Sequence, residues 1–172
     1  MKLRPRVRSL RALADRYGDV LEDDEFVEPA KQVAAQGFLT KAQLQQVGEW
    51  KSPRSAGRIQ ENTETFVQEM TGFALSAGDE MSRMLPLTCL SGVGWPTASV
   101  ILHFFHPDPY PILDFRALYS VGASVPSQYR FPFWWEYVQC ARGLRKKSGL
   151  SMRDLDKALW QYSAENQTAD SA

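Results

Sequence analysis

The sequence has few residues of the types that build metal sites and disulfide frameworks. Among its 172 residues are two cysteines and two histidines, and its formal net charge is zero. Cys89 and Cys140 cannot form a four-cysteine site, and we expect each to be a buried structural thiol. His103 and His106 have no third histidine, cysteine or glutamate at ligand spacing, so we predict no metal site. A zero net charge also supplies no overall field that would attract nucleic acid.

Long hydrophobic runs are absent as well. The longest apolar stretch, from Ala98 to Phe105, is interrupted by His103 and is too short to span a bilayer. The segment from Met1 to Arg11 carries basic residues with no apolar core after them, so we expect no secretory signal. These features predict a cytoplasmic protein with no membrane partner.

Apolar residues recur at helical spacing along the chain, and no period-two strand run or internal repeat is present. We therefore predict an all-α fold with about seven or eight helices. With 44% hydrophobic residues, the chain is long enough for one compact domain. We place this domain at residues 1–163, followed by a flexible C-terminal tail at residues 164–172, where small polar residues dominate.

Several helix boundaries are expected from local signals. Glu28-Pro29 is typical of a helix start, and Gly37 of the end of that helix. Thr40 opens a capping box of the form Thr-Lys-Ala-Gln, which begins the next helix. A loop with a proline stop is predicted from Lys51 to Arg54, and a single long amphipathic helix from Ser55 to Ser76.

A glycine hairpin occupies Leu90-Ser91-Gly92-Val93-Gly94, between a short segment that Pro86 opens and a helix that starts at Trp95-Pro96-Thr97. Glycines permit positive φ angles and allow the backbone to approach another molecule closely. Their N–H groups, together with the helix N-terminus, are suited to an anion such as a DNA phosphate. The alternative is that the two glycines only make a tight chain reversal.

Beyond the hairpin, Pro107, Pro109 and Pro111 stiffen a connection that leads to Asp114. Aspartate is a favoured N-cap, and residues 115–121 followed by Gly122 have the pattern of the helix that it would cap. A cap and a catalytic role are compatible, because a carboxylate at a helix N-terminus stays ionised and accessible.

The hairpin LSGVG, the following WPTAS and the later YPILDFRALYSVG together resemble the helix-hairpin-helix (HhH-GPD) family of DNA glycosylases. The segment PILD is most similar to the adenine-mismatch and endonuclease III-like branch of that family. The resemblance implies that Asp114 is the catalytic aspartate and that duplex DNA is the partner. It implies DNA contacts by the hairpin and the start of the next helix: Leu90, Ser91, Gly92, Val93, Gly94, Trp95 and Thr97. Hairpin carbonyls in this family can hold a monovalent cation, and we expect no other cofactor.

The chain departs from that family in two respects. Members that also cleave the DNA strand carry a nucleophilic lysine two residues after the second hairpin glycine, and this position is Pro96 here. Proline has no free amine for a Schiff base, so the resemblance implies a monofunctional glycosylase that uses water. Two cysteines also cannot ligate the iron–sulfur cluster that some members contain.

Other residues have two interpretations each. Lys51 and Arg54 contact the DNA backbone or are simply loop surface. Glu61 or Glu64 supplies a second, acid-catalytic carboxylate, or both glutamates face solvent. Trp134 and Trp135 belong to an aromatic helix, where they stack on a flipped base or form part of the core. For the cations, the glutamates and the tryptophans alike, the surface or core role is the more frequent one in proteins.

Three functional hypotheses follow from the sequence. The leading one is a monomeric, monofunctional base-excision DNA glycosylase, a hydrolase of DNA repair in which Asp114 assists release of a damaged or mispaired base. The second is a DNA-binding module of the same fold without catalysis. The third is an all-α interaction protein in which the hairpin is a plain turn.

Overall fold

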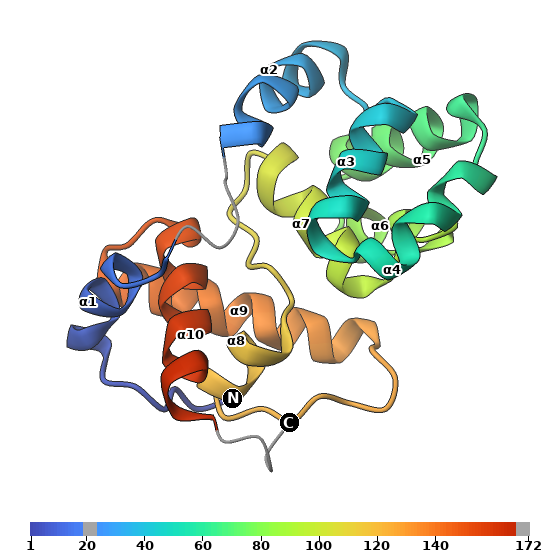
Figure 1. The fold of residues 1–172 in the computed structure, drawn as a ribbon. Coiled ribbons are helices and arrows are strands. Elements are labelled where there is room, and N and C mark those ends of the chain that lie inside the picture. The colour runs from blue at the N-terminus through green and yellow to red at the C-terminus, as the bar shows by residue number, and fades with distance from the viewer. Residues whose placement is uncertain (19–23, 168–172) are drawn as a thin grey trace. The chain divides into compact units, whose positions relative to one another are not determined.

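A computed structural model describes residues 1–18 and 24–167, and within these ranges every regular element is helical (Figure 1). The prediction of an all-α fold is confirmed. The described part contains ten α-helices, more than the seven or eight expected, and four short 3-10 helices. The α-helices are α1 Leu10–Asp15, α2 Val27–Gln36, α3 Lys41–Lys51, α4 Pro53–Ala56, α5 Glu64–Ser76, α6 Glu80–Met84, α7 Trp95–Phe105, α8 Phe115–Ser120, α9 Phe131–Ser148 and α10 Met152–Asn166. The 3-10 helices are η1 Val7–Ser9, η2 Asp24–Phe26, η3 Gly57–Glu61 and η4 Pro86–Cys89.

The chain divides into two compact units, and the extent of one domain over residues 1–163 stays a prediction. The central unit comprises Leu21–Asp108, and the terminal unit comprises Met1–Val20 together with Pro109–Ala172. Helix α10 continues through Asn166, so the first three residues of the predicted tail, 164–166, are helical. Residues 168–172 of that tail, and residues 19–23, lie outside the described residues.

In the central unit, α3 and α7 are the elements around which the others pack. Helix α3 contacts α4, α5, η3 and α7, while α7 also contacts α2 and α6 (Figure 1). Helix α7 is apolar over most of its circumference, and its residues 97–102 are all buried. A helix with that pattern belongs inside a protein rather than at its surface. The fully buried residues of this unit include Leu39, Leu44, Val47, Ile59, Val67, Met84, Leu87, Val100, Ile101 and Leu102.

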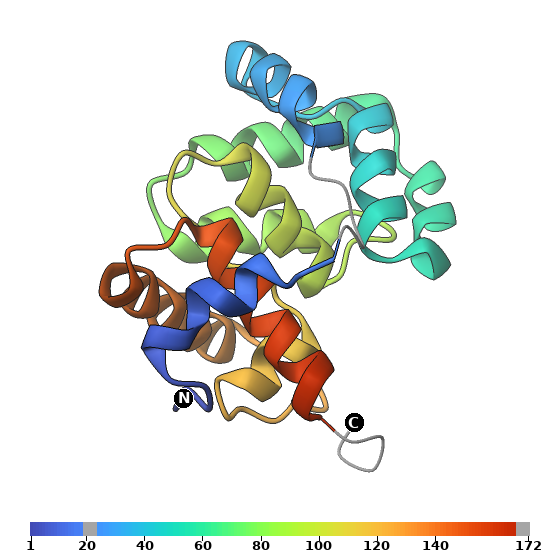
Figure 2. The same cartoon turned by 60° about the vertical axis from the view of Figure 1, so that its left-hand side comes forward.

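In the terminal unit, α10 packs against α1, α8 and α9, and Figures 1 and 2 both show α10 beside α1. The fully buried residues include Leu10, Leu113, Leu118, Val121, Trp134, Tyr137, Val138, Leu155 and Leu159. The Trp134 ring stacks on that of Tyr110, with centroids 5.9 Å apart, so Trp134 is a core residue. Trp135 is half-buried and stacks on Phe131, with centroids 6.4 Å apart.

Several predicted helix ends are confirmed. Helix α2 ends at Gly37, where φ is 83°. Thr40 and Gln43 form the predicted capping box, in which the Thr40 side chain accepts the Gln43 N–H at 3.2 Å and the Gln43 side chain accepts the Thr40 N–H at 2.9 Å. These bonds satisfy two donors that would otherwise lack partners at the start of α3.

The predicted single helix over residues 55–76 is wrong. The chain there forms α4, η3 and α5, and it is interrupted at Asn62, whose backbone is extended at φ −78° and ψ 145°. The Asn62 amide donates to the Ile59 carbonyl at 2.9 Å, and Thr63 caps α5 by accepting the Phe66 N–H at 3.2 Å. Side chains of this type compete with the helix for backbone hydrogen bonds, and they break the helix here. The apolar residues keep their helical spacing across the break, and the sequence therefore predicted a single helix.

A proline position accounts for one further correction. The residues from Lys51 to Arg54 are not a loop, because α3 includes Lys51 and Pro53 occupies the first turn of α4. The proline that was interpreted as a stop begins a helix, since its fixed φ suits the first turn. Pro132 has the same position in the first turn of α9.

The expectation for the cysteines is also wrong. Cys89 is exposed and Cys140 is half-buried, so neither is a fully buried thiol. Within residues 1–18 and 24–167, no helix combines the length and apolar character needed to cross a membrane.

Candidate functional site

The glycine hairpin lines a hollow of about 510 Å³ in the central unit. All five hairpin residues, from Leu90 to Gly94, contribute to its wall, together with the first turn of α7. The end of α3, α4 and η3 also line it. The remaining lining residues are Lys51, Ser52, Ser55, Arg58, Thr88, Cys89, Pro96 and Thr97.

The two hairpin glycines have different structural roles. Gly92 has φ of 82°, and a Cβ atom at this position would lie 2.9 Å from both the Ser55 carbonyl oxygen and the Ile59 side chain. Gly92 is therefore required because the chain's own backbone approaches it closely. Gly94 is exposed, has φ of −89°, and a Cβ there would meet only the Pro96 ring, at 3.7 Å. A side chain at Gly94 would extend from the open side of the hairpin.

The hairpin is held in place by the side chain of Asn62, which the sequence analysis did not single out. The Asn62 amide oxygen accepts the Ser91 N–H at 2.9 Å, and its NH₂ group donates to the Ser91 carbonyl at 3.0 Å. Asn62 is only 6% exposed, whereas Ser91 is half-buried. The two bonds therefore satisfy the polar atoms of a buried side chain, which would be costly to leave unpaired.

The backbone N–H groups of the hairpin differ in whether they have a hydrogen-bond partner within the described residues. The Ser91 N–H donates to Asn62, and the Val93 N–H donates to the Leu90 carbonyl at 3.0 Å. Among the described residues, the N–H groups of Gly92 and Gly94 have no hydrogen-bond partner. Gly94 is also the N-cap of α7, where the helix dipole favours an anion.

Two cations share the hollow with the hairpin. Lys51, at the end of α3, and Arg58, in η3, both line it, whereas Arg54 and Trp95 do not. Arg58 is strongly exposed and forms an ion pair with Glu61 at 3.8 Å. An exposed pair of this length contributes little, so the guanidinium can exchange Glu61 for another anion. The structure thus brings Lys51 and Thr97 to the hairpin and adds Arg58, which the sequence analysis missed.

Asp114 lies in the terminal unit and is the N-cap of α8, as predicted. Its carboxylate accepts the Arg116 N–H at 2.9 Å, and its own backbone is extended at φ −142° and ψ 143°. The residue is partly exposed. Burial raises the pKa of the Tyr129 hydroxyl, and the charge of the Asp114 carboxylate raises it further.

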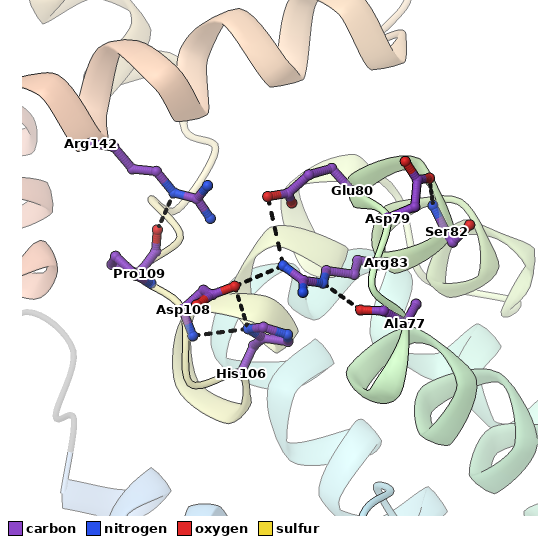
Figure 3. A network of polar contacts seen from close by, with 9 residues as sticks. All are labelled: Ala77, Asp79, Glu80, Ser82, Arg83, His106, Asp108, Pro109 and Arg142. Carbon is purple, nitrogen blue, oxygen red and sulfur yellow. Dashed lines mark hydrogen bonds and ion pairs between the residues drawn. The ribbon is translucent and has the colours of Figure 1, made fainter.

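The chain passes from the central unit to the terminal unit at Asp108–Pro109, and Asp108 is held firmly within the central unit. Arg83 donates to the Asp108 carboxylate at 2.8 Å and to the Ala77 carbonyl at 2.7 Å, and lies 3.6 Å from Glu80 (Figure 3). The Asp108 N–H donates to His106 Nδ1 at 3.0 Å. These contacts of Arg83 and His106 therefore have a structural role at the end of the central unit.

The two glutamates considered as a second catalytic carboxylate both have local partners. Glu64 accepts the Lys41 N–H, at 3.2 and 3.3 Å, and an amide hydrogen of Gln68 at 2.9 Å. Glu61 pairs with Arg58. Both contacts lie in the central unit and provide caps or surface ion pairs.

Comparisons of the chain with models of protein families, with curated proteins and with solved structures found no match.

The residues that sequence reasoning missed around the hollow are Ser52, Ser55, Arg58, Asn62 and Thr88. Arg58 follows Arg54 by four positions, but the two residues lie in different elements, α4 and η3, and only Arg58 lines the hollow, so helical spacing gave no signal for it. Asn62 had no local signal either, because its partner Ser91 is 29 positions away.

Proposed function

We propose that this protein is a monofunctional DNA glycosylase of the helix-hairpin-helix type. The observation that carries the proposal is the hollow at the hairpin, where two backbone N–H groups without internal partners, a helix N-terminus and two cations converge. A phosphate is the anion that such donors and charges suit best, and backbone contacts of this kind hold DNA without reading its sequence.

Asp114 is the proposed catalytic carboxylate. In the proposed reaction the glycosidic C–N bond breaks and its electron pair leaves with the base, while a water oxygen bonds to the anomeric carbon of the sugar. One proton of that water is lost, and one proton is taken up by the departing base. The carboxylate stabilises the positive charge that develops on the sugar or activates the water, as carboxylates do in glycoside hydrolysis.

Pro96 supports the restriction to hydrolysis. It lies in the first turn of α7 and lines the hollow. A proline nitrogen within the chain has no proton and no free electron pair for a Schiff base, so strand cleavage by an amine at this position is not available.

A second candidate is a DNA-binding module that has no catalytic activity. The observation that favours it is the engagement of Asp114 as a helix cap, which gives this aspartate a structural reason to be present. In this case the hairpin binds duplex DNA in the same way, but no base is released.

A screen of lesion-containing duplexes tests both candidates. Each duplex carries one damaged or mispaired base, and mass spectrometry detects the free base after incubation with the protein. Release of a base, with strands that break only after alkali or heat, supports the monofunctional glycosylase. Binding that weakens with salt but gives no release from any duplex supports the non-catalytic module, and no binding at low salt contradicts both.

A further inference from the structure

The segment that leads into Asp114, residues 109–113, has little backbone support of its own. It lies outside the helices, and Pro109 and Pro111 have no N–H to donate. A segment of this kind has a defined conformation only where side chains of neighbouring elements form hydrogen bonds with its backbone. In the terminal unit these side chains come from α9 and α10.

Ile112, two residues before Asp114, is held by both of its backbone polar groups. The Tyr137 hydroxyl, from α9, donates to the Ile112 carbonyl at 3.1 Å. The Ile112 N–H lies 3.3 Å from each oxygen of Asp156, from α10, and donates to this carboxylate. Further along α9, Arg142 donates to the Pro109 carbonyl at 3.0 Å, as Figure 3 shows.

The two side chains that hold Ile112 are themselves buried. Tyr137 has no exposed surface, and Asp156 is 5% exposed. A buried hydroxyl or carboxylate is stable only when it is hydrogen-bonded, so these contacts are difficult to exchange for water. Burial also raises the pKa of Tyr137, and the charges of Asp156 and Asp114 raise it further, so its hydroxyl keeps the donated proton.

We propose that Tyr137 and Asp156 are positioning residues for Asp114. By holding the N–H and the carbonyl of Ile112 from two different helices, they fix the backbone from which the Asp114 carboxylate extends. The inference rests on the proposed function for the catalytic importance of Asp114. The positioning itself is a property of the terminal unit that can be measured without a reaction.

Tyr137→Phe removes only the hydroxyl that holds Ile112, and Tyr119→Phe is its matched control. The Tyr119 hydroxyl also donates to a backbone carbonyl of the same unit, that of Asn166, at 3.2 Å. Amide hydrogen exchange measured by NMR reports on the Arg116 N–H, which donates to Asp114. We expect about tenfold faster exchange at Arg116 in Tyr137→Phe, from the loss of about one hydrogen bond, and no change in the control.

Base release is the second readout. With a substrate from the lesion screen, Tyr137→Phe should lower the single-turnover rate about tenfold while the Kd for DNA stays within about twofold, because the hairpin is unaffected. Asp156→Asn perturbs the same contact from α10 by removing one accepting oxygen. It should also accelerate Arg116 exchange, and it decides the question alone if Tyr137→Phe does not fold.

The outcomes separate this inference from the proposed function. Unchanged Arg116 exchange in the folded variants overturns the positioning role, whatever the catalytic result. Faster exchange with an unchanged rate of base release also overturns it, because Asp114 then acts without being held. If the wild-type protein releases no base, the proposed function fails, and the exchange measurements still decide whether Tyr137 and Asp156 hold Asp114.

Discussion

Asn62 holds Ser91 by both backbone groups, accepting its N–H at 2.9 Å and donating to its carbonyl at 3.0 Å. One side-chain amide thus pairs with both the N–H and the carbonyl of one hairpin residue, as the backbone of a neighbouring strand does in a sheet. The same amide donates to the Ile59 carbonyl, so Asn62 links the hairpin to η3.

Asn62→Ala should therefore destabilise the central unit and disorder the hairpin. The variant loses three hydrogen bonds and leaves both backbone groups of Ser91 without these partners, which costs about 1–3 kcal/mol, so the melting temperature should fall accordingly. Asn166→Ala is the matched control, because the exposed Asn166 amide donates to one carbonyl at the end of α10. A melting temperature that falls equally in the two variants would contradict the role of Asn62.

The two glycine positions give opposite predictions. Gly92→Ala should destabilise the fold by more than about 1 kcal/mol, because its Cβ would meet the backbone of Ser55 and its φ is positive. Gly94→Val should keep the fold, since space is open there, but should weaken DNA binding by covering the hairpin N–H groups. The measurements are thermal melting and fluorescence anisotropy with duplex DNA. Unchanged affinity in folded Gly94→Val would exclude this face of the hairpin as the binding surface.

The cations predict a pattern in the salt dependence of binding. Lys51→Ala and Arg58→Ala should each weaken DNA binding and reduce the slope of log K against log salt by about one unit, as expected for loss of one phosphate contact. Arg54→Ala should leave the slope unchanged, because Arg54 does not line the hollow. Equal effects at all three positions would indicate binding by general charge attraction.

Asp114→Asn tests the proposed chemistry. Asparagine caps helices about as well as aspartate, so the melting temperature and DNA affinity should change little. Base release should fall by about 10³-fold, because the charge that stabilises the developing cation is lost. Single-turnover release from a substrate of the lesion screen is the measurement. Release at the wild-type rate would show that Asp114 is only a cap and would favour the non-catalytic module.

The sequence predicted local features of this protein well. The cap at Asp114, the capping box at Thr40 and the end of α2 at Gly37 were all confirmed. Each depends on hydrogen bonds between residues a few positions apart, so the required residue types stand together in the sequence. The apolar residues of α7 cover most of its circumference, and this pattern alone indicates a buried helix.

Features that depend on distant residues were not predictable. The break at Asn62 is stabilised partly by Ser91, and the need for glycine at position 92 arises from Ser55 and Ile59. The hydrogen bonds that hold Ile112 come from Tyr137 and Asp156, which are 25 and 44 positions away in the sequence. The chemical environment of Asp114 is therefore a product of tertiary packing.

The division of the chain also has a consequence for how the protein folds during synthesis. The central unit is one continuous segment, Leu21–Asp108, whereas the terminal unit needs both ends of the chain. Its α1 packs on α10, and contacts such as that between Arg11 and Asp154 join residues 143 positions apart. A ribosome releases the whole central unit before α10 exists, so that unit can form first. Once formed, it shortens the loop that the late pairing of α1 with α10 must close, which lowers the entropy lost in that step.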